Sequence, residues 1–359
     1  MRIRAERDDL ADVLARAGRA VGTRSPLPIL QGILCEVSGG TLTVTGTDNE
    51  VTVRTYLDVE VGEEGRTVIH AKLAAEAVRK LPYGAVTLAA SDGEVEITGG
   101  GPRFKLRAMP VDDYPKITDT AIENAIEVDG SQLIEALGQA GIAASTDDAR
   151  PTLTGVLFEG EGDHLRLVAT DSYRLSVRDV EGVATEGSKL VPYRALRELG
   201  RTIGAGPMTV ALGEREASFV TSQGRLTVRI IDAVFPNYKQ LLPEDHANRL
   251  IVDKGAFLEA VGRAALVAED HIPVRLAMHA GGVELSVIRQ EVGEATELLE
   301  GEYTGDDMTI AFNTRYLTDG LNAVADEKVV VETSDPLKPG LLLGAEKRDF
   351  QYLLMPVRL

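Results

Sequence analysis

One arrangement of helices and strands recurs three times along the chain and restricts its fold more than any other feature. Each copy is predicted to begin with a helix, followed by a strand, a turn and a second strand. A further strand then leads into a second helix and more strands. That further strand contains Val68, Leu190 and Ile310, which are 122 and 120 residues apart. A repeat of this length predicts three tandem domains.

An earlier strand in each copy shows a similar spacing. It contains Leu42, Leu165 and Val283, which are 123 and 118 residues apart. Clusters of acidic and turn-forming residues, VDDYPKITDTAIEN and FPNYKQLLPEDHAN, separate the copies. Amphipathic helices among alternating strands favour an α+β fold, with the helices covering one face of antiparallel sheets. The predicted domains are residues 1–120, 121–245 and 246–359.

Acidic residues outnumber basic ones, yet one predicted helix is basic. The 38 Lys and Arg residues against 56 Asp and Glu give a net charge of -18, which taken alone disfavours nucleic-acid binding. In the segment YRALRELGRTIG, however, Arg194, Arg197 and Arg201 recur with helical spacing. The apolar stripe expected on another face of this helix comprises Leu196, Leu199 and Ile203.

The second helix of the first copy repeats this arrangement, with basic residues on one side and apolar residues on another. A solvated basic face that acids balance elsewhere is a simpler alternative for both helices. The basic residues of the first copy are Lys72, Arg79 and Lys80. The expected buried stripe comprises Leu73, Ala77 and Leu81.

The sequence contains no evident catalytic or metal-binding motif, and we expect no cofactor. The five histidines lack metal-ligand spacing. The three glycines at 99–101 lie between two predicted strands, which fits a hairpin turn better than a phosphate-binding loop. Cys35 lies in the strand-like segment GILCEV and is expected to be buried and inert. No apolar run suits a membrane span or signal peptide, so we expect a cytoplasmic location.

Asp48 in GTDNE and Asp171 in ATDSYRL occupy equivalent places in the first two copies. Paired carboxylates can serve acid–base catalysis, so a carboxylate-dependent hydrolase is one alternative function. Asp is also favoured in the turn after a strand, because its side chain accepts hydrogen bonds from the backbone. We favour the turn and expect no catalysis.

The chain ends with the apolar segment QYLLMPVRL, although chain ends are usually polar. Alternation along a strand would direct Tyr352 and Leu354 toward the core of the third domain. Leu353 and Met355 would then face a cleft for another molecule. The tail is therefore predicted to be both a final strand and one wall of a binding site.

Several segments resemble the bacterial DNA polymerase sliding clamps, which are the beta subunits of replicative holoenzymes. These segments are LPIL, VATDSYRL, FPNYKQLLP, AFNTRYL and the terminal MPVRL, and the resemblance extends over the whole chain. The family implies a head-to-tail homodimer that closes as a ring around duplex DNA, with the helices lining the hole. It also implies a non-catalytic processivity factor, cytoplasmic and associated with the nucleoid, whose basic lining contacts phosphates without reading bases.

The resemblance also implies partners that carry a short clamp-binding peptide. They include the alpha subunit of the replicative DNA polymerase, the clamp loader and repair polymerases. The family places the peptide in a cleft between the second and third domains, and apolar anchors with a few polar groups suit such a site. The deeper part of the cleft is expected to comprise Leu153, Thr170, Ser172, Tyr173, Arg174, Leu175, Pro236, Gln240, Leu241, Leu353 and Met355. The shallower part is expected to comprise Asn313, Tyr316, Leu337, Pro339, Pro356, Val357, Arg358 and Leu359.

Two further sets of residues follow from the family and from the basic helices. The family match gives Arg24 as a DNA contact, and the helices add Lys72, Arg79, Lys80, Arg194, Arg197 and Arg201. For ring closure, the family match pairs Phe104 and Leu106 of one subunit with Leu266 and Val267 of the next. Glu297 and Glu300 flank that interface and are expected to pair with basic groups near Lys72 and Arg103.

Three places in the chain depart from the family pattern. Many members have Gly-His where this chain has Ser172-Tyr173, and a basic residue in place of Gln240. Some members have two tyrosines that touch DNA where this chain has Pro151-Thr152. The altered cleft leaves a second alternative open, a paralogous clamp used for repair or for resistance to a clamp-binding natural product.

Overall fold

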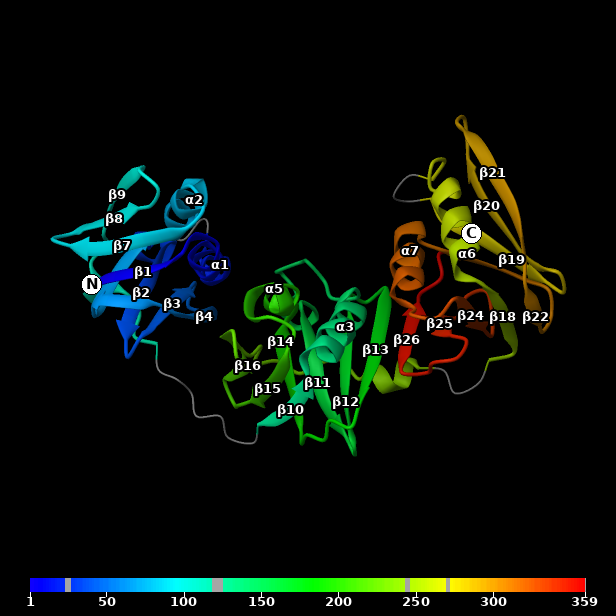
Figure 1. The fold of residues 1–359 in the computed structure, drawn as a ribbon. Coiled ribbons are helices and arrows are strands. Elements are labelled where there is room, and N and C mark those ends of the chain that lie inside the picture. Colours follow the sequence, from blue (N-terminus) through cyan, green and yellow to red (C-terminus); the bar gives the residue numbers. More distant parts are fainter. Residues whose placement is uncertain (23–26, 118–124, 243–245, 269–271, 359) are drawn as a thin grey trace. The chain divides into compact units, whose positions relative to one another are not determined.

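The computed structural model describes residues 1–22, 27–117, 125–242, 246–268 and 272–358. Arg24 and Leu359 therefore lie outside the described residues. The chain divides into two compact units. Figure 1 labels their helices and strands. The first comprises Met1–Ile134 and Glu198–Ile230, and the second comprises Glu135–Arg197 and Ile231–Leu359.

The three predicted copies are present with a similar order of helices and strands, although the second has two short helices, α4 and α5, where the others have one, and no counterpart of β5 and β22. The first contains β1 (Arg2–Glu6), α1 (Arg7–Ala17), β2 (Gly32–Ser38), β3 (Thr41–Thr47), β4 (Val51–Asp58), β5 (Glu60–Glu63), β6 (Gly65–His70), α2 (Ala71–Lys80), β7 (Ala85–Ser91), β8 (Glu94–Thr98) and β9 (Arg103–Arg107). The second contains β10 (Ile126–Asp129), α3 (Gly130–Gly141), β11 (Gly155–Glu161), β12 (His164–Thr170), β13 (Arg174–Glu181), β14 (Ser188–Pro192), α4 (Tyr193–Leu196), α5 (Leu199–Ile203), β15 (Pro207–Leu212), β16 (Glu216–Thr221) and β17 (Gly224–Arg229).

The third copy ends with the C-terminal strand. It contains β18 (Asn248–Asp253), α6 (Lys254–Ala264), β19 (Val274–His279), β20 (Gly282–Arg289), β21 (Gly293–Glu300), β22 (Glu302–Thr304), β23 (Met308–Phe312), α7 (Thr314–Ala323), β24 (Lys328–Thr333), β25 (Gly340–Gly344) and β26 (Phe350–Leu354). The spacing of Val68, Leu190 and Ile310 is explained, because these residues lie in β6, β14 and β23, the strands that lead into the second helices.

Three of the helices, α3, α6 and α7, begin where an Asp or Asn side chain satisfies a first backbone N–H group. The N-terminal N–H groups of a helix have no partner within it, so Asp and Asn are favoured at the preceding residue. Asp253 accepts from the N–H of Ala256 at 2.7 Å, and Asn313 accepts from that of Tyr316 at 3.0 Å. Asp129 accepts from Ser131 at 2.8 Å at the start of α3.

Among the described residues, all strand pairs are antiparallel, and each unit has two sheets. The first unit contains the sheets β5-β1-β7-β8-β9 and β10-β15-β16-β17-β4-β3-β2-β6. The second contains β14-β11-β12-β13-β26-β25-β24-β18-β22 and β21-β20-β19-β23. Apolar residues of α1, including Leu10 and Leu14, are fully buried and pack with strand residues such as Ile33 and Val44 in the core of the first unit.

Two of these sheets join one copy to the next through equivalent strands. In the first seam, β4 of the first copy pairs with β17, the last strand of the second copy. In the second seam, β13 of the second copy pairs with β26, the last strand of the third. β4 and β13 are both the third strand after the first helix of their copy. The remaining members of this series, β21 and β9, are edge strands of the described sheets.

Some predictions about individual elements were wrong. The first strand of each copy (β1, β10 and β18) was missed, as were β4, β5, β21 and β22. YRALRELGRTIG is not one helix but two short ones, because Glu198 between them has φ -103° and ψ 7°. Leu73 was expected to be buried but is 50% exposed, because α2 packs through Ala71, Ala74, Ala75, Ala77 and Val78 instead.

The predicted environments of other residues are confirmed. Leu196, Leu199 and Ile203 are buried, although they lie on two helices instead of one. Cys35 is fully buried, and this burial raises the pKa of its thiol to about 12, which keeps it protonated and inert. Among the described residues, the helices are too short or too polar to cross a membrane.

Candidate binding sites

The turn between β12 and β13 fixes one end of the candidate cleft. Asp171 Oδ1 accepts from the N–H groups of Tyr173 at 2.9 Å and Arg174 at 3.1 Å. Thr170 Oγ1 donates to the carbonyl of Arg174 at 2.7 Å and accepts from the N–H of Ser172 at 3.2 Å. These bonds hold Ser172 at φ +83°, a left-handed conformation that favours glycine. The turn consequently presents Tyr173, which is 59% exposed.

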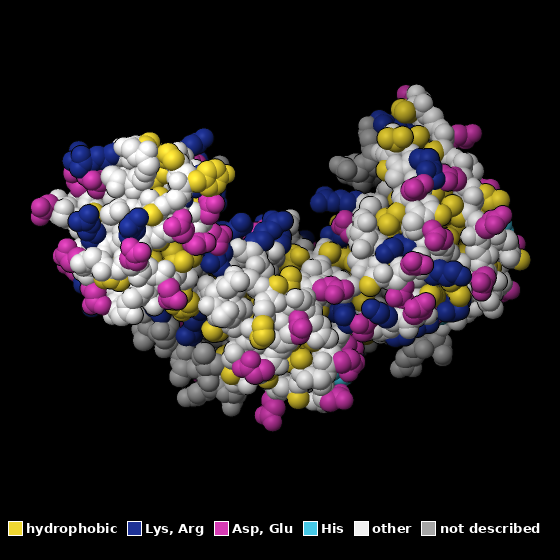
Figure 2. All heavy atoms as spheres, in the orientation of Figure 1, with side chains coloured by type: hydrophobic (Ala, Val, Ile, Leu, Met, Phe, Trp, Pro, Cys, Tyr) yellow, Lys and Arg dark blue, Asp and Glu magenta, His cyan; other side chains and the backbone are white. Residues whose placement is uncertain are grey.

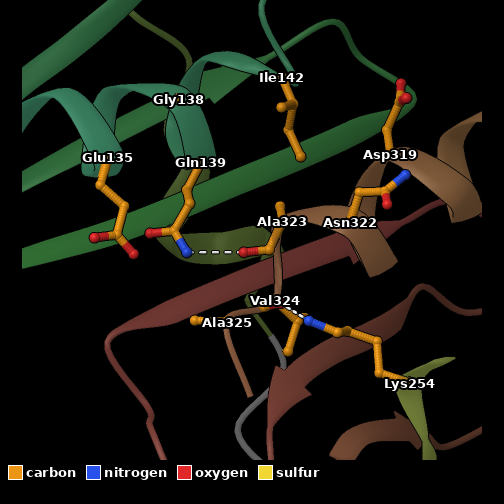
Figure 3. A pocket seen from close by; sticks show the side chains of 10 residues that line it. All are labelled: Glu135, Gly138, Gln139, Ile142, Lys254, Asp319, Asn322, Ala323, Val324 and Ala325. Carbon is orange, nitrogen blue, oxygen red and sulfur yellow. Dashed lines mark hydrogen bonds between the residues drawn. The ribbon is translucent and has the colours of Figure 1, made fainter. Parts of the chain in front are cut away.

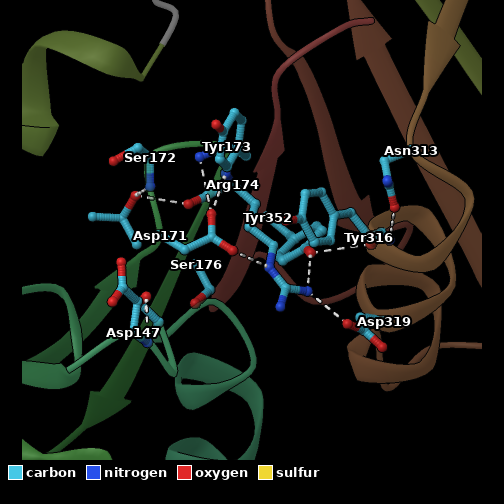
Figure 4. Close-up of polar contacts among 12 residues, drawn as sticks. Asp147, Asp171, Ser172, Tyr173, Arg174, Ser176, Asn313, Tyr316, Asp319 and Tyr352 are labelled. Atoms are coloured by element: carbon cyan, nitrogen blue, oxygen red, sulfur yellow. Dashed lines mark hydrogen bonds and ion pairs between the residues drawn. The ribbon is translucent and has the colours of Figure 1, made fainter. Parts of the chain in front are cut away.

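Arg174 connects the second and third copies (Figure 4). Its Nε donates to Asp171 Oδ2 at 2.9 Å, and its Nη1 donates to Asp319 Oδ2 on α7 at 2.6 Å. Nη1 also lies 3.2 Å from the hydroxyl of Tyr352 on β26. Burial alone would lower the pKa of Arg174, but Tyr352 and the two carboxylates raise it overall. Arg174 therefore stays charged and holds three elements together.

Aromatic rings and the C-terminal residues surround this arginine. The rings of Tyr173 and Tyr316 stack with centroids 6.4 Å apart, and the Arg174 guanidinium lies 4.4 Å from the Tyr316 ring centroid. The N–H of Met355 donates to the carbonyl of Tyr173 at 2.9 Å. The N–H of Val357 donates to the carbonyl of Ala311 in β23 at 2.8 Å. The tail is thus attached to both the second and the third copies.

The apolar residues expected at the base of the candidate cleft lie in the second seam. Leu175 and Leu353 face each other across β13 and β26 and belong to one buried cluster with Leu157 and Tyr238. Leu353 is only 2% exposed, and its predicted contact with a partner stays a prediction. The neighbouring Met355 is 43% exposed, as expected for a wall of the cleft. Tyr352 and Leu354 are buried, as predicted.

The remaining predicted cleft residues differ in exposure. Leu153 and Thr170 are buried, whereas Leu241 is 47% exposed and Gln240 is exposed. Leu337 is 65% exposed, and its N–H donates to Asp335 Oδ1 at 2.8 Å in the turn before β25. The structure joins Tyr173, Arg174, Leu175, Tyr316, Leu353 and Met355 directly through the contacts above. The other predicted members with intermediate or high exposure are Ser172, Pro236, Asn313, Pro339, Pro356, Val357 and Arg358.

A second polar network, which the sequence did not predict, links the second and third copies. Gln139 on α3 accepts from Arg178 Nε at 2.6 Å and donates to the carbonyl of Ala323 at 2.8 Å. Arg178 Nη1 also contacts Asp349 Oδ2 at 2.5 Å. A cavity of about 590 Å³ lies beside Gln139, and Glu135, Asp319 and Lys254 also line it (Figure 3). Because both acidic and basic side chains line this cavity, its lining does not favour an anion.

The predicted basic residues are exposed, but acids compensate some of them. Lys72 Nζ lies 4.0 Å from Glu76 on the next turn of α2. Arg201 lies 3.7 Å from Glu198, which also pairs with Arg19 at 2.8 Å. On the face shown in Figure 2, Asp and Glu side chains interleave with Lys and Arg. The exposed basic residues on these helices and between them are Lys72, Arg79, Lys80, Arg194, Arg197 and Arg201.

The residues predicted at the subunit interface lie on or near the two edge strands. Phe104 and Leu106 alternate along β9 and are half-buried, and Leu266, after α6, is 86% exposed. Val267 is half-buried and Glu300 is exposed.

Two of the charged residues predicted to form ion pairs across that interface, Glu297 and Arg103, instead form ion pairs within the chain. Glu297 accepts two bonds from Arg263 at 2.6 and 2.9 Å, which lower the pKa of the Glu297 carboxyl. Arg103 contacts Glu96 at 2.5 Å. Glu297 and Arg103 would therefore have to exchange partners before pairing between subunits.

Asp48 and Asp171 accept hydrogen bonds from backbone N–H groups in their turns, as predicted. Asp48 Oδ1 accepts from the N–H groups of Glu50 at 2.9 Å and Val51 at 2.7 Å, which matches the bonding of Asp171. Each carboxylate is thus part of its own turn, and the hydrolase alternative gains no support. Asp163, His164 and Glu181 come within 4.8 Å of one another at a hairpin, although the sequence predicted no such cluster. Exposed acidic groups of this kind are common without a metal.

Comparison with known proteins identifies the family. Residues 1–118, 127–237 and 239–358 match the models of the N-terminal, central and C-terminal domains of the DNA polymerase III beta subunit. The chain belongs to the DNA polymerase III beta subunit family. The beta sliding clamp of Streptomyces coelicolor is 34% identical to it, with each chain covered in full.

Two further relatives are a sliding clamp of known structure and a sliding clamp homologue. A Pseudomonas aeruginosa sliding clamp crystallised with griselimycin superposes with a TM-score of 0.95 at 27% identity, and each chain is covered in full. The beta sliding clamp homologue GriR of Streptomyces muensis is 29% identical, with 100% of this chain and 99% of the relative covered. The fold prediction of three antiparallel clamp domains is thereby confirmed.

Proposed function

We propose that this chain is a sliding clamp that closes as a head-to-tail homodimer around duplex DNA and tethers the replicative polymerase. The repeated seam carries this proposal. The third strand of the first copy pairs with the last strand of the second, and the third strand of the second copy pairs with the last strand of the third. The matching strands left over are β21 and β9, which are sheet edges among the described residues. Pairing β21 of one subunit with β9 of another would continue the series.

Such a contact joins two different surfaces, so it closes only if successive rotations complete a ring. Exposed strand edges otherwise promote uncontrolled association, which gives a reason for them to be covered by a partner subunit. Two subunits of three copies each would provide six repeats of the seam. We assign Phe104, Leu106, Leu266, Val267, Glu297 and Glu300 to this interface.

The proposed DNA contacts are sequence-independent. Arginine and lysine on the helices attract phosphates, whereas the overall charge of -18 repels nucleic acid from the rest of the surface. Because the closed ring would hold the clamp on DNA by topology, the clamp needs only weak contacts with the phosphates. The proposed contacts are Arg24, Lys72, Arg79, Lys80, Arg194, Arg197 and Arg201.

We further propose that the cleft around Arg174 binds the short peptides of polymerase, clamp loader and repair proteins. Exposed Met355, Leu241 and Tyr173 supply apolar contact area, and the Arg174 network fixes its position. The role is non-catalytic, and the proposed location is the cytoplasm, at the nucleoid.

A measurement of mass tests ring closure. The proposal predicts a mass of twice 38.5 kDa by sedimentation. Leu266→Lys should shift it to the monomer mass, because a lysine would be buried without a partner in the interface. Val234→Lys is the matched control, because Val234 is 93% exposed and lies outside the proposed interface. A monomeric unsubstituted protein, or equal loss of mass in both variants, would contradict the proposal.

A paralogous clamp with altered ligand preference remains a second candidate because of one observation. Tyr173 stands where many family members have histidine. It is exposed and stacks on Tyr316. Titration of the chain with the polymerase's own clamp-binding peptide distinguishes the two roles. Binding comparable to that of a replicative clamp supports the main proposal, whereas at least tenfold weaker binding favours the paralogue.

A further inference from the structure

The cavity beside Gln139 has no role in the functions proposed above. Its volume of about 590 Å³ falls within the range of small-ligand sites. Its walls come from α3 of the second copy, from α7 of the third copy with the residues that follow it, and from the start of α6. The apolar part of the lining comprises Ile142, Ala323, Val324 and Ala325. A ligand in this cavity would therefore contact both copies.

Hydrogen bonds hold the two sides of the cavity in place (Figure 3). Both ends of the Gln139 amide are used, because it accepts from Arg178 at 2.6 Å and donates to the carbonyl of Ala323 at 2.8 Å. Lys254 Nζ, at the start of α6, donates to the carbonyl of Val324 at 2.8 Å. These bonds join the second and third copies around the cavity, so its lining is formed without a ligand.

Two side chains of opposite charge in the lining have no ionic partner among the described residues. Lys254 is half-buried, and its Nζ has the carbonyl of Val324 as its hydrogen-bond acceptor. Glu135 is exposed on α3, and its carboxylate forms no ion pair within the described part of the chain. The remaining charge in the lining, Asp319, is offset by Arg174, which donates to it at 2.6 Å. The cavity thus offers one carboxylate and one ammonium group for pairing.

These opposite charges discriminate between classes of ligand. A partly buried ammonium group loses hydration that one carbonyl only partly replaces, so a carboxylate beside Lys254 would be favoured. An ammonium or guanidinium group beside Glu135 would complete a second pair. A ligand with a single charge would leave one of these groups unpaired and would be repelled by the other. The lining therefore favours a ligand that carries both charges.

A glycine leaves part of the cavity open. Gly138 lies in the interior of α3, where glycine is less favourable than alanine. A Cβ atom at this position would meet no other atom of the described residues within 4 Å, so close packing does not require glycine here. Because Gly138 lines the cavity, a larger side chain would occupy space that is available to a ligand.

We propose that this cavity binds a dipolar ligand, one that carries a carboxylate and an ammonium or guanidinium group on a short apolar chain. The carboxylate pairs with Lys254 and the cationic group pairs with Glu135, while the apolar chain lies against Ile142 and Val324. The acidic surface does not repel such a ligand, because its net charge is zero. A free amino acid and the neighbouring Lys and Asp side chains of a partner's peptide share this chemistry.

Ligand-observed NMR titration of the full chain with 6-aminohexanoate tests the proposal, with hexylamine and hexanoate as controls that carry a single charge. We expect saturable binding of 6-aminohexanoate, at least about tenfold tighter than that of either control, because each control lacks one ion pair. Added salt should weaken this binding. The capped peptide GKADG carries both charges on side chains. Tighter binding of the peptide than of 6-aminohexanoate identifies a partner segment as the ligand, and weaker binding identifies a small molecule; either result upholds the proposal.

Two substitutions test the role of each charge. Glu135→Gln should remove the preference for 6-aminohexanoate over hexanoate, and Lys254→Gln should remove its preference over hexylamine. Each comparison is made within one variant, so a general loss of stability does not imitate the result. The matched controls are Glu186→Gln and Lys328→Gln, because both residues are exposed and lie outside the lining. They should change each preference less than about twofold.

The open space beside Gly138 gives an independent test. Gly138→Leu should fill part of the cavity and weaken binding at least about tenfold, while the midpoint of thermal unfolding stays the same or rises. Gly138→Ala is the control and should change affinity less than about twofold, because its methyl group meets no other atom. Absence of saturable binding, equal binding of the singly charged controls, or an unchanged preference in both charge variants would overturn the proposal.

Discussion

The two seams have the same strand pairing but different side chains. At the second seam Leu175 faces Leu353 above a buried apolar cluster, whereas at the first seam Thr52 faces Thr227 beside two arginines. Both seams begin at a Thr-Asp turn with the same hydrogen bonds. The difference indicates that the repeated backbone forms the same strand pairing twice, and that the residues of each copy decide whether the seam is lined by apolar or by polar and charged side chains.

The largest expected difference between the seams is the loss in free energy of unfolding when the buried arginine of the second seam is replaced. Arg174→Met would leave Asp171 and Asp319 without their cation, and we expect it to lower the free energy of unfolding by about 4 kcal/mol. Arg54→Met is the comparison at the first seam and should cost less than half as much. Urea denaturation followed by circular dichroism measures both. Similar costs would show that Arg174 is not a special connection between copies.

The apolar base should show the next largest effect. Leu353→Ala removes a fully packed side chain, and we expect a loss of about 3 kcal/mol. Thr227→Ala, at the equivalent place in the first seam, should cost less than about 1 kcal/mol because its hydroxyl lies in a polar cavity. The same denaturation experiment distinguishes them. A larger cost for Thr227 would contradict the assignment of the apolar core to the second seam alone.

Removal of the tail should affect binding more than stability. The N–H of Val357 bonds to β23, yet β26 ends before it at Leu354. Deletion of residues 357–359 should weaken polymerase-peptide binding at least about tenfold, equivalent to about 1.4 kcal/mol. The dimer mass should not change. If the dimer dissociates instead, the tail is mainly structural.

Substitutions in the two turns should give the smallest difference in stability between the seams. Ser172 has φ +83°, so Ser172→Gly should relieve strain and stabilise the chain by up to about 1 kcal/mol. Asn49→Gly should have less effect, because asparagine tolerates the left-handed conformation better than serine. Thermal unfolding measures both. Destabilisation of the Ser172 variant would mean that its side chain makes a contact stronger than the strain.

Local patterns predicted much of the fold but not the connections between copies. Apolar spacing located the helices, and the Thr-Asp motif located both turns, because these depend on neighbouring residues. Arg174 and Asp319 are 145 residues apart, and no local pattern indicates that they pair. The seams, too, depend on which strand edges meet in three dimensions. The break at Glu198 was missed because helical spacing continues across it.

The residue assignments for the cleft depended on resemblance to the family. Without the family, helical spacing and the C-terminal segment suggested only a basic face and an apolar tail. The structure added Tyr352, Asp319 and the network around Gln139. It also showed that Leu353 is buried. The predicted domain limits at 120 and 245 remain predictions.

Retention on circular DNA tests the central claim most directly. The chain would be loaded by its clamp loader with ATP onto a nicked circle, and the bound fraction followed before and after the circle is cut. A closed ring held by topology should stay on the circle and leave rapidly once the DNA is linear. Equal rates of loss from circular and linear DNA would contradict the account.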